Sequence, residues 1–429
     1  ELLLTDAFFR YSVEVRVGYP APRAADPDWH IDPPPRPDPV NLFYQALAAG
    51  DLAAFLHQLP PPHPGYTRLR EALRHYRQML LEGGWPTIPD GPSLKLGVRH
   101  PQVALLRQRL AREGYLEPGP TPSDPYVYDR ALEQAVRDYQ LHYGRKVDGI
   151  VGRYTRRTLN IPLRVRIGQI ERNMEPRRLG RRYIMVNMAG YNLQLIDDER
   201  PTLNMRVVIG KPYRSTPAFE DMLRYIEINP TWKVPPRIAR EKMLPRLREE
   251  PDFLQAHHLK VYSSWYEDAV ELAPSEVDWN EVSDEWFPYM LEQTPGPHNS
   301  MGRIKFMFPN RFRIYLHDTP ARYLFNRSKR TYSAGCIRVE RPVTLAAQLL
   351  DDPRQWSKRR IRAVIRSRQT QRVDLTVPVP VYLLYWTVWV DVDGGVHFRD
   401  DVYQRNVHIA TSGEDRSIPT PEALANAYF

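Results

Sequence analysis

The apolar residues change their period once along the chain, near residue 182, and this change limits the folds available to it. Before that point they recur at helical spacing, as in Leu69, Leu73 and Tyr76. After it, short apolar runs such as 183–188 and 223–228 alternate with turn residues, which is typical of a β-sandwich or barrel. A chain of 429 residues usually forms two or three domains. We therefore expect a multidomain α+β protein whose mostly β-sandwich domain follows helical domains.

Two helical regions are expected before the change. Residues 1–88 read as a helical scaffold segment, broken by the proline-rich stretch 31–39, which must be extended because proline lacks the helical N–H group. Residues 94–161 read as a small three-helix domain. The apolar stripes of its helices predict a packed core rather than a sugar-binding platform. The residues of these stripes are Val103, Leu106, Leu110, Leu132, Val136, Tyr139 and Tyr143.

The β-rich domain is expected to span residues 180–410. Helical and polar material over residues 232–293 interrupts its strands, and an insertion of this size suits a lid over a cleft. A helix is expected over 342–350, and the closing strands over 379–390.

The net charge of +9 favours acidic partners through long-range attraction. The basic residues are dispersed, however, and the short clusters such as 358–362 lack the aromatic residues and motifs of a nucleic-acid interface, so we expect no nucleic-acid partner. A solvated basic face or attraction to a carboxylate-rich cell wall remains. No apolar stretch is long enough to span a membrane. The chain opens without Met, as if inside a helix, so we expect a targeting segment to precede it.

Cys336 is the only cysteine, so it cannot form an internal disulfide or a cysteine-based zinc site. Such a thiol is either a buried small hydrophobe or a nucleophile. His317 lies at the end of an expected strand, and an imidazole can lower the pKa of a thiol and carry its proton. The small residues Ser333, Ala334 and Gly335 would allow backbone N–H groups to approach an oxyanion near the sulfur.

This pattern resembles the signature of the L,D-transpeptidases with the YkuD-type catalytic domain. His317 is followed by eighteen residues and then by Cys336 within the segment 333–338, Ser-Ala-Gly-Cys-Ile-Arg. The chain departs from the family at Ala334, where many members have a second histidine. Segments 229–236, 295–306 and 316–320 resemble the large periplasmic branch, and 94–161 resembles the peptidoglycan-binding domain that such members carry.

The resemblance implies a peptidoglycan L,D-transpeptidase that forms 3-3 crosslinks through a cysteine acyl-enzyme and releases the terminal D-alanine of a donor tetrapeptide. Cys336 would be the nucleophile and His317 the base. Ser333 would orient the imidazole, and N–H groups of Gly335 and Cys336 would bind the oxyanion. The expected substrate-binding residues are Arg338, Tyr315, Ala334, Asn299, Gly302 and Trp232, and the cleft wall would include His298, Ser300 and Met301.

The implied partners are donor and acceptor stem peptides, other cell-wall synthesis proteins, and carbapenems as covalent inhibitors. The implied location is the Gram-negative periplasm. We expect no cofactor and no metal site, since His-Glu-x-x-His is absent and the adjacent His257 and His258 would point apart.

Three alternatives stay open at the level of sequence. A cysteine peptidoglycan hydrolase or carboxypeptidase would pass the acyl group to water. A papain-like order, with the cysteine before the histidine, would need His397 or His408 as base. A wall-binding scaffold without catalysis would leave the thiol inert. The acceptor could equally be a second stem peptide, a lipoprotein lysine or water.

Overall fold

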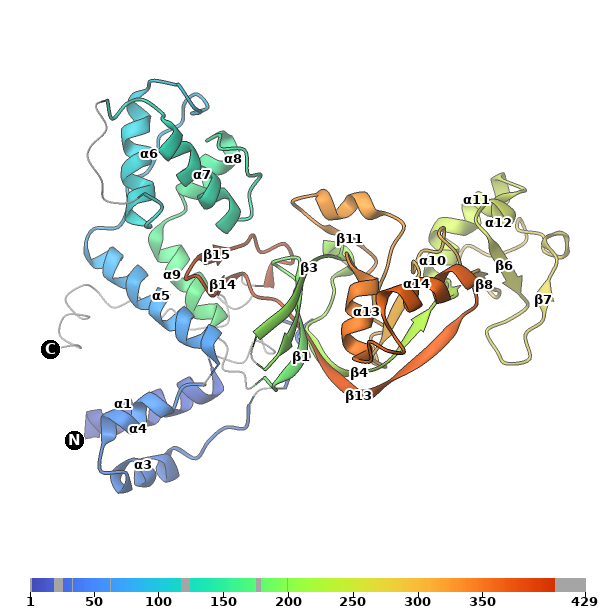
Figure 1. Ribbon diagram of the computed structural model, residues 1–429, viewed down its shortest axis with the longest axis horizontal. Coiled ribbons are helices and arrows are strands. Elements are labelled where there is room, and N and C mark those ends of the chain that lie inside the picture. The colour runs from blue at the N-terminus through green and yellow to red at the C-terminus, as the bar shows by residue number, and fades with distance from the viewer. Residues whose placement is uncertain are drawn as a thin grey trace. The chain divides into compact units, whose positions relative to one another are not determined.

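The computed structural model describes residues 2–18, 26–32, 34–61, 63–116, 124–174, 179–198 and 200–405. The chain divides into two compact units, and Figure 1 shows the elements of each. The first unit comprises the chain up to Gly180, the short stretch Asn187–Gly190 and the chain from Leu384 onward. The second comprises Arg181–Val186 and Tyr191–Leu383. None of the helices in the described ranges is both long and apolar enough to cross a membrane.

The first unit is mainly helical, as expected. Its helices are α1 (Leu2–Val17), α3 (Pro39–Ala48), α4 (Leu52–Gln58), α5 (Pro64–Leu81), α6 (Pro101–Arg112), α7 (Arg130–His142), α8 (Arg153–Leu159) and α9 (Leu163–Asn173). Several starts follow from local chemistry: the carboxylates of Asp38, Asp51 and Asp129 each accept a backbone N–H in the first turn of a helix.

The core of the first unit draws on both ends of the chain. Helices α5 to α9 bury their apolar faces together with the hairpin of β14 (Val388–Val390) and β15 (Val396–Phe398). Phe398 stacks on Tyr143 with ring centroids 5.1 Å apart, and it also packs against Tyr76. The tyrosine stripe of α7 is therefore core, as predicted. Val388 and Val390 were expected in the closing strands of the β domain. Their apolar side chains are instead buried in this helical core.

The second unit is built on one curved sheet, which has nine strands in the described part of the chain, in the order β11-β3-β12-β10-β9-β4-β13-β1-β2. Because β2 also pairs with β3, the sheet bends back on itself rather than forming two separate layers. Its strands are β1 (Arg182–Asn187), β2 (Asn192–Asp197), β3 (Arg200–Gly210), β4 (Phe219–Ile228), β9 (Ile304–Met307), β10 (Leu316–His317), β11 (Thr331–Ser333), β12 (Ile337–Val339) and β13 (Gln371–Leu384).

Alternation of side chains explains how this sheet holds its core. Leu316, Ile337 and Val339 point to the same side and are fully buried, as is Phe306 on the neighbouring strand. Helices α13 (Pro342–Leu350), at the predicted position, and α14 (Lys358–Ser367) follow β12, and α14 buries only Ile361 and Val364. The short turns η1 (Pro212–Arg214) and η4 (Arg322–Asn326) connect strands of the sheet.

The insertion over residues 232–293, predicted as a lid, has its own fold, and it is less helical than the sequence predicts. A four-stranded antiparallel sheet, in the order β5-β8-β6-β7, packs against short helices around a buried cluster that includes Leu244, Phe253 and Leu291. Its elements are β5 (Trp232–Lys233), α10 (Pro236–Ile238), η2 (Ala239–Met243), α11 (Leu244–Glu249), α12 (Phe253–Ala256), β6 (Leu259–Tyr262), β7 (Glu271–Leu272), η3 (Pro274–Glu276) and β8 (Met290–Gln293). The overall class, a multidomain α+β protein with a helical N-terminal region and a large sheet, is confirmed.

Candidate active site

Strands β10 and β12 pair in parallel and bring the candidate catalytic residues onto neighbouring strands. His317 is the register partner of Arg338, and Leu316 that of Ile337. Because side chains alternate along a strand, Cys336 and Arg338 share one face, and Tyr315 and His317 share the same face on the next strand. Leu316 and Ile337 occupy the opposite, fully buried face. One sheet face thus collects a thiol, an imidazole and a guanidinium.

His317 is 4% exposed, and its ring orientation is fixed by backbone carbonyl groups. Its Nδ1 lies 2.5 Å from the carbonyl oxygen of Asp318, which acts as acceptor, so Nδ1 carries the proton and Nε2 has the free lone pair. Burial, and next the charge of Arg338, lowers the pKa of His317 to about 3, although hydrogen bonds to the carbonyls of Asp318 and Met301 oppose this shift. The imidazole is therefore neutral at ordinary pH.

The loop before β9 closes over His317, and Gly302 makes this possible. Gly302 has φ +67, and a Cβ at this position would lie 2.4 Å from the Cβ of Asp318. The carboxylate of Asp318 in turn accepts the N–H of Arg303 at 3.0 Å. A side chain at residue 302 would therefore displace the residue next to the imidazole. Gly302 contributes to this part of the site by close packing against Asp318.

Asn299 holds this loop together through its side chain. The side chain is fully buried. Its amide nitrogen donates to the carbonyls of Pro230, Gln293 and Thr294, and its side-chain oxygen accepts the N–H of Met301 at 2.8 Å. With all these groups paired in the protein interior, Asn299 positions the loop.

Cys336 follows a tight turn, and its thiol is hydrogen-bonded to a backbone carbonyl. Its Sγ lies 3.7 Å from the carbonyl oxygen of Arg313, to which it donates. Between the described residues no hydrogen bond joins the sulfur to His317. Burial raises the pKa of the thiol, while the Tyr315 backbone and the charges of Lys305 and Arg338 oppose the increase. The expectation that the imidazole lowers this pKa is not met in this conformation.

Ser333 stabilises the turn through its hydroxyl group and its backbone carbonyl. Its hydroxyl donates to the carbonyl oxygen of Cys336 at 2.5 Å and accepts the N–H of Gly335 at 3.2 Å. Its own carbonyl accepts the N–H of Lys211. The N–H of Gly335, expected in an oxyanion hole, is therefore already paired. Gly335 has φ +125, a backbone conformation that favours glycine.

Sequence reasoning missed Thr216. Its side chain is fully buried, and its hydroxyl donates to the carbonyl oxygen of Gly335 at 2.7 Å. The hydroxyl oxygen of Thr216 in turn accepts the N–H of Gly210 at 3.0 Å. A single threonine between two strands carries no signal of this contact, because residues 216 and 335 are far apart in sequence.

Arg338 is the clearest candidate for binding a carboxylate. Its Nε is buried without a hydrogen-bond partner, and no ion pair involves this guanidinium within the described ranges. Burial lowers its pKa, and the neighbouring Cys336 opposes the shift. Tyr315, half-buried beside it, packs under Lys305, whose Nζ lies 4.5 Å from the ring centroid. Lys305 also pairs with Glu227 at 3.6 Å. A free buried guanidinium next to a thiol is suited to an anionic ligand.

The remaining expected site residues are more dispersed. Ala334 is exposed next to the thiol. Trp232 lies on β5 and packs against the core of the lid. His298 stacks on His258 with centroids 3.7 Å apart, so one imidazole of the adjacent pair, His257 and His258, packs on this loop. Ser300 donates its N–H to Gln293, and Met301 is buried beside His317.

Two further histidines, His397 and His408, were considered as alternative bases. His397 belongs to the first unit and hydrogen-bonds to Asp391 at 2.9 Å, whereas Cys336 belongs to the second. His408 lies outside the described residues. Within those residues, one group of three metal-ligating side chains converges: His142, Asp391 and His397. Sequence alone does not indicate this group, because His142 is about 250 positions from the other two residues.

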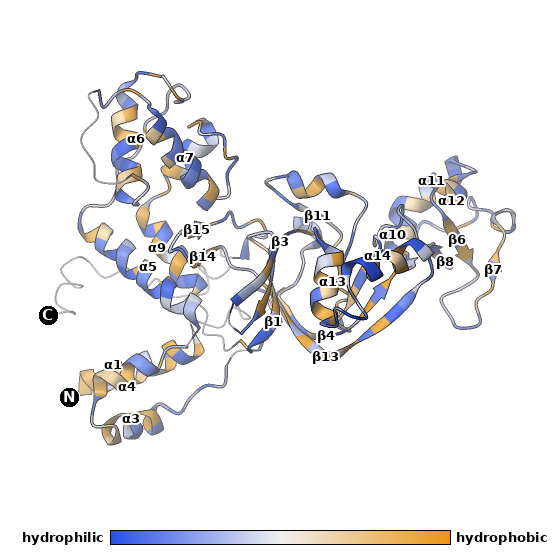
Figure 2. Ribbon diagram, in the orientation of Figure 1, coloured by the Kyte–Doolittle hydropathy of each residue, from blue (hydrophilic) through white to orange (hydrophobic). Residues whose placement is uncertain are grey.

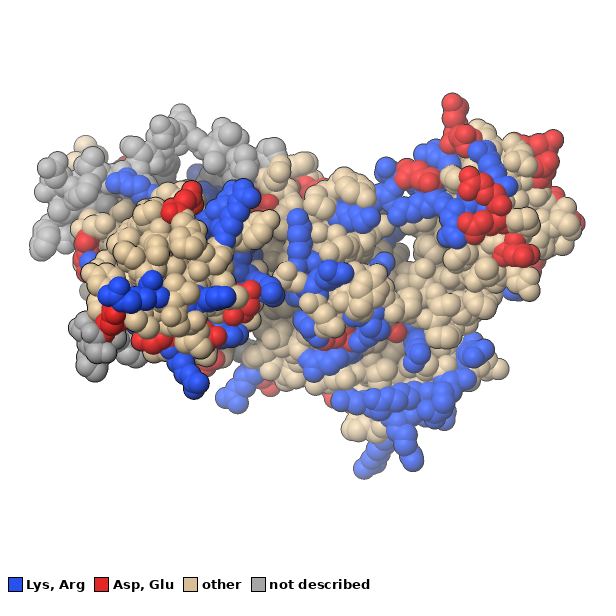
Figure 3. All heavy atoms as spheres, turned by 90° about the horizontal axis from the view of Figure 1, so that it is seen from above, with Lys and Arg blue, Asp and Glu red and all other residues tan. Residues whose placement is uncertain are grey.

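The second unit carries a strongly basic face on α14. Figure 2 shows this helix as markedly hydrophilic, and Figure 3 shows a dense group of Lys and Arg side chains along one edge. In the described part of the chain none of its exposed cations has an ion pair. These are Lys358, Arg359, Arg360, Arg362, Arg366 and Arg368. Such a face attracts polyanions without specifying one.

Comparison with protein families assigns three parts of the chain. Residues 181–373 match the family described as "L,D-transpeptidase catalytic domain", known as YkuD. Residues 99–159 match the family "Putative peptidoglycan binding domain", and residues 1–73 match a family described as "Scaffold domain". These ranges fall within the three regions that the sequence separated.

A curated relative, the "Putative L,D-transpeptidase" of Haemophilus influenzae, is 34% identical over 229 residues. The match covers 53% of this chain and 45% of the relative, so it spans about half the length of each. A solved L,D-transpeptidase from Xylanimonas cellulosilytica is 15% identical, covering 69% of this chain and 99% of that chain, with a TM-score of 0.22. One from Stackebrandtia nassauensis is 13% identical, covering 70% and 96%, with a TM-score of 0.24. At these scores the two structures add nothing to the assignment.

Proposed function

Because residues 181–373 of this chain are an L,D-transpeptidase catalytic domain of the YkuD type, we propose that the protein forms 3-3 crosslinks in peptidoglycan through a thioester on Cys336. The observation that supports this most is the shared sheet face of β10 and β12, with Cys336, His317 and the unpaired Arg338 side by side. The peptidoglycan-related domains associate the protein with the cell wall, and we place it in the periplasm.

In the acylation step, the sulfur of Cys336 attacks the carbonyl carbon of the diamino acid in a donor tetrapeptide. The bond to the terminal D-alanine breaks, and the thiol proton passes through Nε2 of His317 to the leaving amine. Arg338 is placed to hold a stem-peptide carboxylate. In the second step an acceptor amine attacks the thioester, forms the crosslink and restores the thiol.

The step requires two changes from the resting arrangement. The thiol must leave the carbonyl of Arg313 and turn toward His317, and the N–H of Cys336, rather than that of Gly335, must bind the oxyanion. Substrate that displaces water from this face would strengthen the attraction between thiolate and imidazolium. This attraction offsets the desolvation cost that burial otherwise imposes on both ions.

Intact mass spectrometry after mixing the protein with disaccharide tetrapeptide tests the proposal. We expect a covalent adduct that lacks one D-alanine, and then crosslinked dimer in solution. Acyl-enzyme followed only by released tripeptide would indicate a hydrolase or carboxypeptidase. Absence of any adduct with wild-type protein, with the fold intact, would support a wall-binding scaffold and refute the proposal. A carbapenem should form an adduct on the same cysteine.

A further inference from the structure

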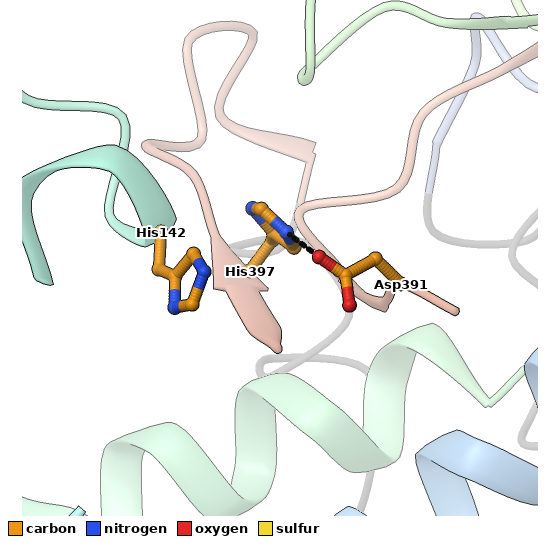
Figure 4. A group of neighbouring side chains, drawn as sticks. All are labelled: His142, Asp391 and His397. Atoms are coloured by element: carbon orange, nitrogen blue, oxygen red, sulfur yellow. Dashed lines mark hydrogen bonds and ion pairs between the residues drawn. The ribbon is translucent and has the colours of Figure 1, made fainter. Parts of the chain in front are cut away.

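Three possible metal ligands converge in the first unit, from parts of the chain that lie far apart in sequence. His142 lies at the end of α7, Asp391 in the turn after β14, and His397 on β15. One ligand atom from each lies within 4.8 Å of the others. Figure 4 shows His142 beside His397, with the carboxylate of Asp391 directed at the His397 ring. Two imidazoles and a carboxylate are a common ligand set for zinc.

The turn fixes the carboxylate of Asp391 in this direction. Its Oδ1 accepts the N–H groups of Asp393 at 3.1 Å and Gly395 at 2.8 Å. Its Oδ2 is then directed at His397, 2.9 Å from Nε2.

Gly395 lies close to two of the donors. A Cβ at this residue would lie 3.0 Å from Nε2 of His142 and 3.0 Å from Oδ2 of Asp391, which is closer than ordinary van der Waals contact. Gly395 has no positive φ, so the missing side chain, not a special backbone conformation, is what the position uses. Zinc bonds to nitrogen and oxygen are about 2.0–2.2 Å, so small side-chain shifts would bring donor atoms that lie within 4.8 Å of one another onto a shared ion.

Outer contacts already orient both imidazoles. Nδ1 of His142 lies 3.0 Å from the hydroxyl of Tyr115, which leaves Nε2 facing Gly395 and the carboxylate of Asp391. The ring of Trp389 stacks on that of His397, with centroids 4.9 Å apart. Arg399, the nearest cation, donates to the carbonyls of His142 and Phe398 and lies against Trp389.

We propose that His142, Asp391 and His397 bind one zinc ion, with water as the fourth ligand, and that the ion fastens the β14–β15 hairpin to α7. The role is structural, because these elements share one buried core. Such a bond would hold the segment that follows the catalytic domain on the peptidoglycan-binding-like helices. The site does not depend on the chemistry proposed for Cys336.

Equilibrium dialysis of chelator-treated full-length protein against Zn²⁺, followed by metal analysis, tests this. We expect one zinc per chain in the wild type. His142→Gln and His397→Gln should each weaken binding by more than roughly 100-fold, because each removes a ligand rather than an outer contact. Gly395→Ala keeps all three ligands but crowds Nε2 of His142 and Oδ2 of Asp391, and it should also lose zinc. Matched controls are His75→Gln on the exposed face of α5 and His258→Gln at the stacked pair with His298; both should keep it.

Thermal unfolding is the second measurement. It compares each protein with and without zinc, so a variant that is merely less stable is not mistaken for one that does not bind zinc. Zinc at about 100 times its dissociation constant should raise the Tm of wild-type protein by roughly 5 °C or more and should not raise that of Gly395→Ala. Equal zinc retention by wild type and all three site variants would mean an adventitious ion only. Wild-type protein that retains no zinc would equally overturn the proposal.

Discussion

The hydroxyl group of Thr216 joins the end of β3 to the turn that precedes Cys336, because it donates to the carbonyl oxygen of Gly335 at 2.7 Å and accepts the N–H of Gly210 at 3.0 Å. Both bonds are buried. The position of the thiol on its sheet face therefore depends on a residue more than a hundred positions away in sequence.

Thr216→Val should lower the rate of acylation without abolishing it. Valine keeps the shape but removes the hydroxyl that bonds to the Gly335 carbonyl and to the Gly210 N–H, and the loss of a buried hydrogen bond costs about 1–3 kcal/mol. Thr216→Ser retains the hydroxyl and is the matched control. Acylation kinetics should show a lower kcat with little change in KM for the donor peptide, because Thr216 positions the turn and does not touch substrate. A valine variant with wild-type kcat would show that the turn holds its geometry without this bond.

Cys336→Ala should abolish acyl transfer while leaving the fold stable. The thiol contributes only a small apolar contact and one weak hydrogen bond, so its loss should change the unfolding free energy by less than about 1 kcal/mol. Intact mass spectrometry measures adduct formation, and thermal unfolding monitors the fold. Turnover that persists in this variant would exclude the cysteine mechanism.

Alkylation of Cys336 by iodoacetamide should accelerate about tenfold per pH unit from pH 7 to pH 9, without a plateau in this range. Burial raises the pKa of the thiol above its usual value, so the thiolate fraction grows across the whole interval. Lys305 and Arg338 favour the thiolate, so Lys305→Gln and Arg338→Gln should slow alkylation at pH 8. Urea-unfolded protein is the reference for an ordinary thiol. A plateau below pH 8 in folded protein would indicate a thiolate paired with His317.

Acid should destabilise the second unit through His317. The ordinary pKa of a histidine is 6.5, whereas the pKa of His317 in the fold is about 3. Between these two pH values the unfolded chain binds a proton that the native state does not. Stability from the neutral ring is therefore complete above pH 6.5 and is lost as pH falls toward 3, by up to about 1.4 kcal/mol per pH unit.

His317→Gln should flatten this pH dependence, measured by urea unfolding from pH 7 to pH 4. His75→Gln, which changes an exposed histidine on α5, should keep the wild-type slope. If His317→Gln and wild type lose stability equally over this range, the imidazole is not held neutral in the native state.

Phe398→Ala should destabilise the first unit by about 3–5 kcal/mol, the usual cost of emptying a buried phenylalanine site. Phe398 is 1% exposed and stacks on Tyr143, with the guanidinium of Arg166 4.7 Å from its ring centroid. Val377→Ala, at a site 67% exposed on β13, is a control that should cost far less. Thermal unfolding measures both. A shift for Phe398→Ala no larger than the control would show that the helices hold their core without the hairpin.

Local sequence patterns predict many of the helices and strands of this protein. Helical spacing of Leu69, Leu73 and Tyr76 predicts the buried face of α5, and strand alternation predicts the sheet, because each depends on neighbours within a few residues. The separation of Cys336 and His317 also identified the candidate pair before any geometry was known. Their catalytic roles remain a prediction.

Tertiary structure decided what depends on distant residues. The parallel pairing of β10 with β12 places Arg338 beside His317. The side chain of Asn299 is buried in a loop that it holds by hydrogen bonds. Packing also moved the 388–398 hairpin into the helical core and brought His142 to His397. A local period records which face of an element is apolar, but not which distant face will cover it, because that choice is made by shape and burial across the whole fold.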